Sequence, residues 1–298
     1  MSDAARPSLA VVVLTLNEAA NLPDCLDSLR GLDGRVVVVD SGSTDRTVEI
    51  AAARGAQVLR HPFESHSRQW RWAIANLDGR PDWILGLDAD QRLSNELRDA
   101  LAQLFAGDRR QLEGVDGFYI CRRQIFRGRW IRHGGYYPKY LLKLFRPERV
   151  LLDEHDLVDH HFYVPGAVNT LTGDLIEDNR KEDEITFWVD KHVRYARLQA
   201  REELARGNGQ SSGVLRPSLF GTADQKTLWQ KRRWATLPLY WRSCAYFAYR
   251  YIIRLGFLDG KEGFAFHVLQ AFWYRLLVDI CLDDLRRGAN LDGNARRQ

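Results

Sequence analysis

The sequence predicts an α/β protein with a mostly parallel sheet, followed by a C-terminal region of aromatic, amphipathic helices. In the N-terminal third, short apolar runs alternate with segments of helical periodicity. Strands that are apolar without interruption are buried on both faces, which is typical of parallel sheets covered by helices. From Lys226 onward, Trp, Tyr and Phe are interleaved with Arg at helical spacing.

The N-terminal third is expected to contain the buried strands Leu9–Thr15, Val36–Val39, Val58–Leu59 and Trp83–Leu87. The expected helices are Ala19–Leu29, Thr44–Arg54, Ser67–Leu77 and Ser94–Phe105. Ser43 or Thr44 suits the N-cap of the second helix, and Ser94 suits that of the fourth. The carboxyl ends of such strands form the ligand-binding edge of the sheet.

The alternation stops near Gly117. Two strands of mixed or antiparallel pairing are expected at Phe118–Arg122 and Leu141–Phe145, and residues 151–175 are interpreted as irregular. Helices are expected at Glu184–Leu204 and Lys226–Leu285, the latter broken near Pro238 and between Gly256 and Gly263. The glycine-rich segment 207–213 is interpreted as a flexible loop or a lid.

Charge is distributed unevenly along the chain. Residues 226–298 hold 13 Lys and Arg against 6 Asp and Glu, an excess of 7, so the net charge of +4 leaves −3 for the rest. A basic, aromatic C-terminal region indicates an anionic partner surface, either a membrane or a nucleic acid. The 4 cysteines are far apart, which favours reduced thiols in the cytosol. No signal peptide is expected, and no spanning helix, because no uncharged apolar stretch is long enough.

Asp88-Ala89-Asp90 directly follows the apolar run Trp83–Leu87. Two carboxylates two residues apart at a strand end can bind one divalent cation, because Mg²⁺ and Mn²⁺ prefer oxygen ligands and leave positions open for substrate phosphate. Asp88 and Asp90 are therefore candidate metal ligands. The alternative is a pair of solvated turn aspartates, since so short a pattern also occurs by chance.

Polar residues also follow the first two strands. In Asp40–Asp45 (DSGSTD), helix capping accounts for Ser43 or Thr44 but not for Asp40, whose carboxylate can accept a hydrogen bond from a base. In Thr15–Glu18 (TLNE), a helix cap by Asn17 with Glu18 in the first turn is the alternative to ligand binding.

Together the stretches VVVLTLNEAANLPDCLDSL, VVVVDSGSTDRTVEIA and WILGLDADQRLS resemble the inverting family 2 glycosyltransferases of the GT-A fold. This resemblance covers the N-terminal third. It implies that uridine is contacted by Thr15, Asn17, Glu18 and Asp40, and that Asp88 and Asp90 face the ribose and a Mg²⁺ or Mn²⁺ ion. It also makes Ser67 and Gln69 candidates for contacts to the diphosphate, because Ser67–Arg71 lies where members of the family place such contacts.

The stretches GGYYPKYLLKLFRPE, FWVDKHVRYARLQARE and YRYIIRLGFLDGKEGFAFHVLQAFWYRLLVD resemble enzymes of lipopolysaccharide-core and exopolysaccharide assembly. The resemblance implies transfer of a hexose, with glucose expected, from a UDP-sugar to a lipid-linked saccharide or a lipopolysaccharide or exopolysaccharide acceptor. It divides the chain into a catalytic domain, residues 1–224, and a membrane-associating helical region, residues 225–298. Within the first, a donor half reaches about residue 115 and an acceptor half follows.

An inverting transfer needs one general base, which deprotonates the acceptor hydroxyl. The candidates are the acids of one segment: Asp153, Glu154, Asp156 and Asp159. Glu154 is preferred because it matches an acid of the second group, although Asp153 stands where that group has His, and Asp153 is the second choice. Each of these could instead be an ordinary surface acid.

Lys191 on the helix Glu184–Leu204 contacts the donor diphosphate or an acidic acceptor, or else belongs to a solvated helix face, and the sequence leaves these alternatives open. Arg129, Arg132 and Lys139 flank an aromatic, glycine-rich turn and are candidates for an acceptor groove. His155, His160 and His161, which lie among the candidate base residues, fit no zinc-binding spacing.

The basic, aromatic C-terminal region predicts a cytoplasmic enzyme that is peripheral at the inner face of a membrane, with an anionic membrane surface as partner. The alternative is a helical subdomain packed on the catalytic half. Nucleic acid is not expected, since it would leave the strand-end motifs unexplained. Two other functions remain open: a sugar nucleotidyltransferase, which would need a phosphate-binding loop that the sequence lacks, and a non-catalytic membrane-recruited scaffold.

Overall fold

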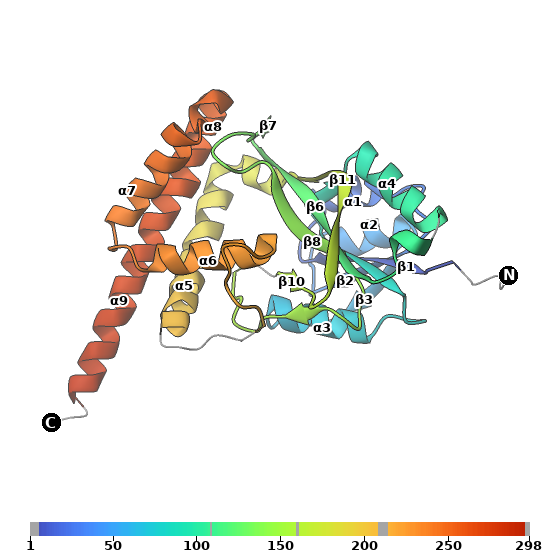
Figure 1. The fold of residues 1–298 in the computed structure, drawn as a ribbon, viewed down its shortest axis with the longest axis horizontal. Coiled ribbons are helices and arrows are strands. Elements are labelled where there is room, and N and C mark those ends of the chain that lie inside the picture. Colours follow the sequence, from blue (N-terminus) through green and yellow to red (C-terminus); the bar gives the residue numbers. More distant parts are fainter. Residues whose placement is uncertain (1–5, 108, 159–160, 208–213, 296–298) are drawn as a thin grey trace.

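A computed structural model describes residues 6–107, 109–158, 161–207 and 214–295. Its centre is a mixed sheet with the strand order β3-β2-β1-β4-β8-β6-β11-β5, and β7 pairs with β6 at one end (Figure 1). The strands of this sheet are β1 (Leu9–Thr15), β2 (Arg35–Asp40), β3 (Gln57–Arg60), β4 (Trp83–Asp88), β5 (Gln91–Leu93), β6 (Val115–Phe126), β7 (Arg129–Trp130), β8 (Lys139–Phe145) and β11 (Ala167–Glu177). A separate ribbon consists of β9 (Leu151–Leu152) and β10 (Phe162–Tyr163).

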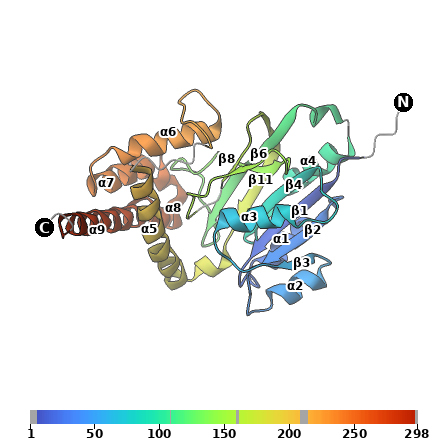
Figure 2. The same cartoon turned by 90° about the horizontal axis from the view of Figure 1, so that it is seen from below.

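The N-terminal strands are all parallel, since β1 pairs with β2 and β4, and β2 pairs with β3. The helices α1 (Leu22–Ser28), α2 (Thr47–Ala53) and α4 (Asn95–Ala106) cover one face, and α3 (His66–Ala75) covers the other (Figure 2). Successive residues of β1 point to opposite faces: Val11 and Val13 contact the first helix layer, whereas Ala10 and Val12 pack with Trp70 of α3. Because both faces are buried, the strand is apolar throughout. The predicted α/β class and all the predicted strands of this half are confirmed.

In the second half, β8 is antiparallel to both β4 and β6, as the sequence indicated. The interpretation of residues 151–175 as irregular was wrong, because β11 pairs with β6 along most of its length. Its first half is mostly exposed, and a bulge shifts the register between Thr170 and Asp174. Gly173 in this bulge has φ +89 and its backbone lies against Leu97. A bulged, half-exposed strand shows no alternation of apolar residues.

The structure settles the predicted helix caps. The Ser94 hydroxyl accepts from the backbone N–H of Leu97 at 3.3 Å, so this cap is confirmed. The predicted cap by Ser43 or Thr44 was wrong, because α2 begins only at Thr47. The carboxylate of Asp45 accepts from the Thr47 N–H at 3.0 Å instead. The residues before Thr47 form a loop that reaches toward the end of β1.

The C-terminal helices pack against the catalytic half. They are α5 (Ile185–Gly207), α6 (Ala223–Ala235), α7 (Trp241–Ala248), α8 (Gly260–Phe266) and α9 (Tyr274–Ala295), with the π-helical turns Tyr249–Ile253 and His267–Trp273 between them. The break predicted near Pro238 is confirmed. The second break lies at Arg254–Leu255 and the short turn Gly256–Asp259, while Gly260–Phe266 is helical. The segment predicted to be a loop or lid falls mostly on residues 208–213, outside the described residues.

One helical run, Gly256–Gly288, is long and apolar enough to cross a membrane by length and composition, with a mean hydropathy of 1.3 and 39% of its most apolar window buried. This differs from the expectation of no spanning helix, which counted only uncharged stretches. A core helix of a soluble protein meets the same criteria.

Candidate functional site at the carboxyl edge of the sheet

The register of the parallel strands brings the three predicted motifs together. Thr15 at the end of β1 pairs with Asp40 of β2, and Leu14 pairs with Asp88 of β4. The loops that leave these strands therefore start side by side. The expectation that the polar strand ends share one edge is confirmed.

Asp40 lies buried beneath this edge. Its carboxylate accepts from the Thr15 hydroxyl at 3.1 Å and from the backbone N–H groups of Gly42 and Ser43 at 3.0 and 2.9 Å. The Ser43 hydroxyl is a further donor. Gly42 has φ +100, a conformation that glycine adopts without strain. Asp40 and Thr15 thus fix the shape of the loop after β2.

Asn17 joins the loops after β1 and β2. Its side-chain carbonyl accepts from the backbone N–H of Thr44 at 2.8 Å, and its backbone N–H donates to the Ser43 hydroxyl at 2.8 Å. It is exposed and has φ +54, which Asn tolerates better than most residues. Asn17 therefore fixes the relative positions of the loops after β1 and β2, which form the rim of the site.

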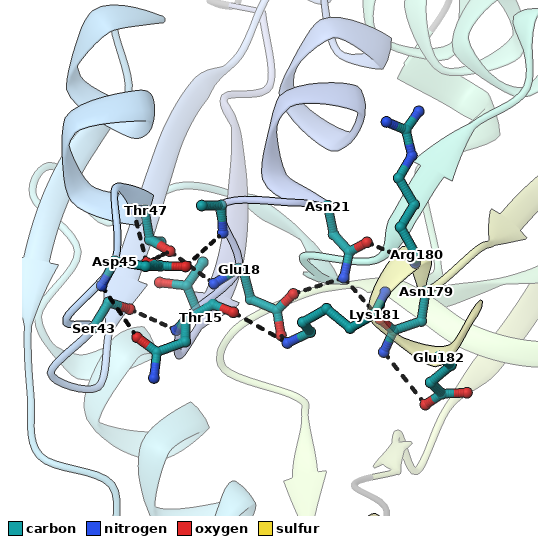
Figure 3. Close-up of polar contacts among 12 residues, drawn as sticks. Thr15, Glu18, Asn21, Ser43, Asp45, Thr47, Asn179, Arg180, Lys181 and Glu182 are labelled. Carbon is teal, nitrogen blue, oxygen red and sulfur yellow. Dashed lines mark hydrogen bonds and ion pairs between the residues drawn. The ribbon is translucent and has the colours of Figure 1, made fainter. Parts of the chain in front are cut away.

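Glu18 connects this rim to the segment that follows β11 (Figure 3). Its carboxylate accepts from Asn21 at 2.8 Å and pairs with Lys181 at 2.5 Å. Asn21 also donates to Asn179 at 2.9 Å and accepts from the Arg180 backbone N–H at 2.9 Å. Residues 179–181 are thereby held beside α1, and the ammonium group of Lys181 lies next to the loop after β1.

Asp88 and Asp90 lie where β4 turns into β5. The Asp88 carboxylate accepts from Lys143 of β8 at 3.1 Å. Burial raises the pKa of Asp90 well above its usual range, and the neighbouring carboxylates of Glu177 and Asp88 add to this rise. Glu177 is itself held by Gln91 at 2.9 Å and Arg122 at 3.0 Å. The site therefore concentrates carboxylates, which favours binding of a cation.

The donor set fits Mg²⁺ or Mn²⁺. These ions are commonly held by one or two carboxylates together with substrate phosphates and water. Asp88 and Asp90 supply two such carboxylates. Within the described ranges, no group of three or more His, Cys, Asp and Glu could hold a metal by itself. Water or the oxygen atoms of a bound substrate would supply the remaining ligands of an ion held by Asp88 and Asp90.

Lys191 of α5 is close enough to Asp90 to interact with it electrostatically. Its ammonium group pairs with Glu182 at 2.6 Å and lies 5.4 Å from the centre of the Tyr195 ring. Burial alone would lower the pKa of Lys191, but Glu182, Tyr195 and Asp90 outweigh this effect and raise it. Lys191 is thus a fixed positive charge that interacts with Asp90.

Ser67 and Gln69 stand at the start of α3, at the same edge of the sheet. Gln69 is fully buried and donates to the Ser41 hydroxyl and to the His61 carbonyl, each at 3.2 Å. Ser67 is buried and lies 3.2 Å from the hydroxyl of Ser65. In this structure Gln69 joins α3 to the loops after β2 and β3, whereas the hydroxyl contact of Ser67 is with the N-cap of its own helix.

The acids proposed as general base lie in the loop between β9 and β10. Glu154 pairs with Arg71 of α3, and both side chains are more than half exposed. The Asp153 carboxylate accepts from the His155 backbone N–H at 2.8 Å. Asp156 is buried between Arg206 at 2.7 Å and His161 at 3.3 Å, which makes it a structural residue. Asp159 and His160 lie outside the described residues.

Two lysines of the site were not predicted from the sequence: Lys143, which pairs with Asp88, and Lys181, which pairs with Glu18. Lys143 had a signal, since it interrupts the apolar strand KYLLKLF and lies almost fully buried there. A buried lysine needs a partner. Lys181 had none, because it belongs to a polar segment whose position depends on the unpredicted strand β11.

The fold and site define an α/β protein with a mostly parallel N-terminal sheet whose strand ends carry acidic residues. The profile described as "Glycosyl transferase family 2" matches residues 10–164, and the chain belongs to this family. The match confirms the family and the GT-A fold class predicted from the sequence.

Relatives add detail at different coverage. An uncharacterized glycosyltransferase of Rickettsia bellii is 38% identical over 106 residues, which are 36% of this chain and 35% of that protein. This chain thus spans about a third of the length of the first relatives it matches. The lipopolysaccharide core biosynthesis glycosyltransferase LpsC of Rhizobium meliloti is 27% identical over 210 residues, 67% of this chain and 73% of that protein.

Among solved structures, the chain is similar to glucosyl-3-phosphoglycerate synthase from Mycobacterium tuberculosis, crystallised with Mn²⁺, UDP and phosphoglyceric acid. The identity is 25%, the match covers 41% of this chain and 44% of that chain, and the TM-score is 0.31. A score this low is too weak to relate the two sites residue by residue.

Proposed function

We propose that the protein transfers a hexose from a UDP-sugar, with inversion, to a lipid-linked saccharide or a lipopolysaccharide or exopolysaccharide acceptor. The observation that carries the proposal is the register that sets Thr15, Asp40 and Asp88 side by side at the ends of parallel strands in a family 2 chain. The relationship to LpsC, which extends over two thirds of the chain, supports the class of acceptor.

In this proposal the loops after β1 and β2 hold the uridine. Asp40 and Thr15 maintain the loop shape, and Asn17 and Glu18 form its outer rim. Gln69 supports the same rim from α3, and Ser67 lies at the start of this helix, at the diphosphate side. Such prearranged donors and acceptors reduce the entropy that substrate binding loses.

Asp88 and Asp90 would hold a Mg²⁺ or Mn²⁺ ion together with the donor diphosphate. Part of the charge that develops on the leaving diphosphate would be neutralised by this ion. The chain itself supplies further positive charge. Lys191 interacts with Asp90, and Lys143 pairs with Asp88, so both can turn to phosphate oxygens when substrate binds.

Glu154 is the proposed general base and Asp153 the second choice. Either must come within about 3 Å of the acceptor hydroxyl to take its proton. In the structure Arg71 holds Glu154, so this ion pair must open or rotate when the acceptor binds. Glu154→Gln should lower kcat about a hundredfold or more while UDP binding persists. A larger effect of Asp153→Asn would transfer the role to Asp153.

The acceptor class implies that the enzyme works at a lipid surface. We propose a cytoplasmic location, peripheral at the inner face of the membrane, with residues 225–298 as the membrane-associating region. The excess of positive charge in that region supports this location, since anionic lipids attract basic segments.

The donor site is tested by thermal shift with uridine, guanosine and adenosine diphosphates, each with and without Mn²⁺. A ligand at about 100 times its Kd stabilises the folded state by about 2.7 kcal/mol, so a shift of several degrees is expected for UDP with Mn²⁺. Asp88→Ala should abolish the metal-dependent part of this shift, whereas Asp99→Ala, a change of an exposed acid on α4, should leave it intact. Absence of any nucleotide effect in folded protein would favour the scaffold alternative.

A further inference from the structure

The end of the C-terminal region that includes α8 (Figure 1) carries six large apolar side chains that are exposed. We name this set the apolar tip. Its members lie between the π-helical turn after α7 and the end of α8: Ile252, Ile253, Leu255, Phe257, Leu258 and Phe264. Ile253 is 69% exposed and Ile252 is 59% exposed. Soluble proteins rarely leave so many apolar side chains together in water without a partner.

The charges around the tip are arranged in a particular way. Arg254 and Lys261 are exposed within it, and Lys261 is 92% exposed. The acids of the same segment are less accessible. Asp259 is buried and pairs with His133 at 2.7 Å, and Glu262, 3.6 Å from Lys261, is about a quarter exposed. The outer surface of the tip is therefore apolar and basic.

A second basic element adjoins the tip. The backbone N–H of Gly134 donates to the carbonyl of Arg254 at 2.9 Å, and Arg250 donates to the Gly134 carbonyl at 2.7 Å. Arg132 immediately precedes this turn and is exposed. Phe126 of β6 contacts Phe266 of α8, so the end of the β6–β7 hairpin lies beside the same tip. Exposed basic residues therefore come both from the tip, with Arg254 and Lys261, and from the turn, with Arg132.

We propose that the apolar tip inserts into the interfacial layer of an anionic phospholipid bilayer, with Arg254, Lys261 and Arg132 facing lipid phosphates. An apolar surface edged by cations suits this environment, because the side chains enter the acyl boundary while the cations remain at the headgroups. The inference deepens the peripheral location put forward under the proposed function. It assigns binding to one end of the region and not to its whole aromatic length.

The long helix α9 is poorly suited to enter lipid. In α9, Tyr274 and Val278 are buried against α5, and Asp279 forms a buried ion pair with Arg242 of α7. For Gly256–Gly288 to span a membrane, α9 would have to leave α5 and expose this pair to hydrocarbon, where charges are costly. Insertion of the tip requires neither change.

The test uses the full-length protein and sedimentation with vesicles of phosphatidylcholine alone or mixed with phosphatidylglycerol. Wild-type protein should bind the mixed vesicles more tightly, and Arg254→Ala with Lys261→Ala should weaken that binding about thirtyfold, since each cation near an anionic surface contributes about a factor of five. Ile253→Glu with Leu258→Glu should weaken binding to both kinds of vesicle, whereas Ile280→Glu on α9, also an exposed apolar site, should not.

Melting temperature and the UDP shift of every variant establish that folding and the donor site are intact. Asp88→Ala should bind vesicles like wild type, so failure of the donor site and failure of the tip are distinguishable. The proposal is overturned if the Ile253→Glu, Leu258→Glu protein binds vesicles normally. It is also overturned if light scattering shows that the substitutions only convert a dimer to a monomer, because the partner of the tip would then be a second copy of the chain. A third contrary result would be wild-type protein that alkaline washing does not release from membranes, as expected for a spanning helix.

Discussion

The contact between the turn at Gly134 and the C-terminal helices is the most sharply testable feature of the fold. His267 is fully buried between Gly134 and Gly256, and a Cβ added to Gly134 would lie 2.0 Å from its ring carbon Cε1. Gly134 also has φ +69. Gly134→Ala therefore introduces both backbone strain and an overlap with a ring that is enclosed by packed side chains.

Gly128 separates these two effects. It has φ +74, but no described atom lies within 4 Å of the position of an added Cβ. Gly128→Ala should cost about 1–2 kcal/mol for the left-handed backbone alone, and Gly134→Ala should cost an additional 1–3 kcal/mol for overpacking. At roughly 2–4 °C per kcal/mol, the melting temperature should fall several degrees further for Gly134→Ala than for Gly128→Ala.

Thermal denaturation of both variants measures the difference, and a double-mutant cycle with His267→Ala assigns it. Removing the ring should reduce the cost of Gly134→Ala to that of Gly128→Ala, although His267→Ala destabilises the protein by leaving a cavity. Equal melting temperatures for the two alanine variants, or a cost that is unchanged without His267, would refute the proposed packing.

Three further outcomes are expected. Burial and the nearby Arg250 lower the pKa of His267 to about 4, and Asp259 opposes this effect. Because the folded state binds this proton less well than the unfolded state, the free energy of unfolding should fall as the pH drops from about 6.5 to 4. In urea titrations, the difference in stability between wild type and His267→Gln should change only in that range. Asp279→Asn should destabilise the protein by about 1–3 kcal/mol, because it removes one of the two carboxylates that pair with Arg242, only 2% exposed, and leaves Glu203 as the other; a loss below 1 kcal/mol in urea denaturation would contradict this. Lys143→Met should weaken metal-dependent UDP binding measured by calorimetry if Lys143 turns to phosphate, and tighter binding would show instead that the lysine only competes for Asp88.

The parallel half of the fold was predictable because its signal is local. Val11, Val13 and their neighbours on β1 are buried on both faces, so the run is apolar and its ends are sharp. The strand β11 gave no such signal. Its pairing with β6 depends on a distant strand, and its bulge at Gly173 fits against Leu97 of α4, a contact that the order of residues does not reveal.

The site was predictable at the level of position more than of role. Thr15, Asp40 and Asp88 converge because adjacent parallel strands bring their carboxyl ends to one edge. The sequence did not predict that Asp40 and Gln69 form hydrogen bonds with the loop after β2, since the contact of Gln69 depends on how α3 packs. Lys143, the partner of Asp88, comes from β8, which is antiparallel to its neighbours. Lys181, the partner of Glu18, follows β11, a strand that was not predicted.

The boundary placed near residue 225 has a physical consequence for experiments on the membrane region. Trp188 of α5 and Tyr136 share a hydrophobic cluster with Phe266 of α8, and Asp224 accepts from the Tyr119 hydroxyl at 2.7 Å just where α6 begins. Deleting residues 225–298 would therefore expose a core surface, and the loss of membrane binding would not be distinguishable from misfolding. Replacing side chains of the apolar tip does not expose a core surface, because they are already exposed in the folded protein. Single surface substitutions there can separate lipid binding from stability, whereas truncation cannot.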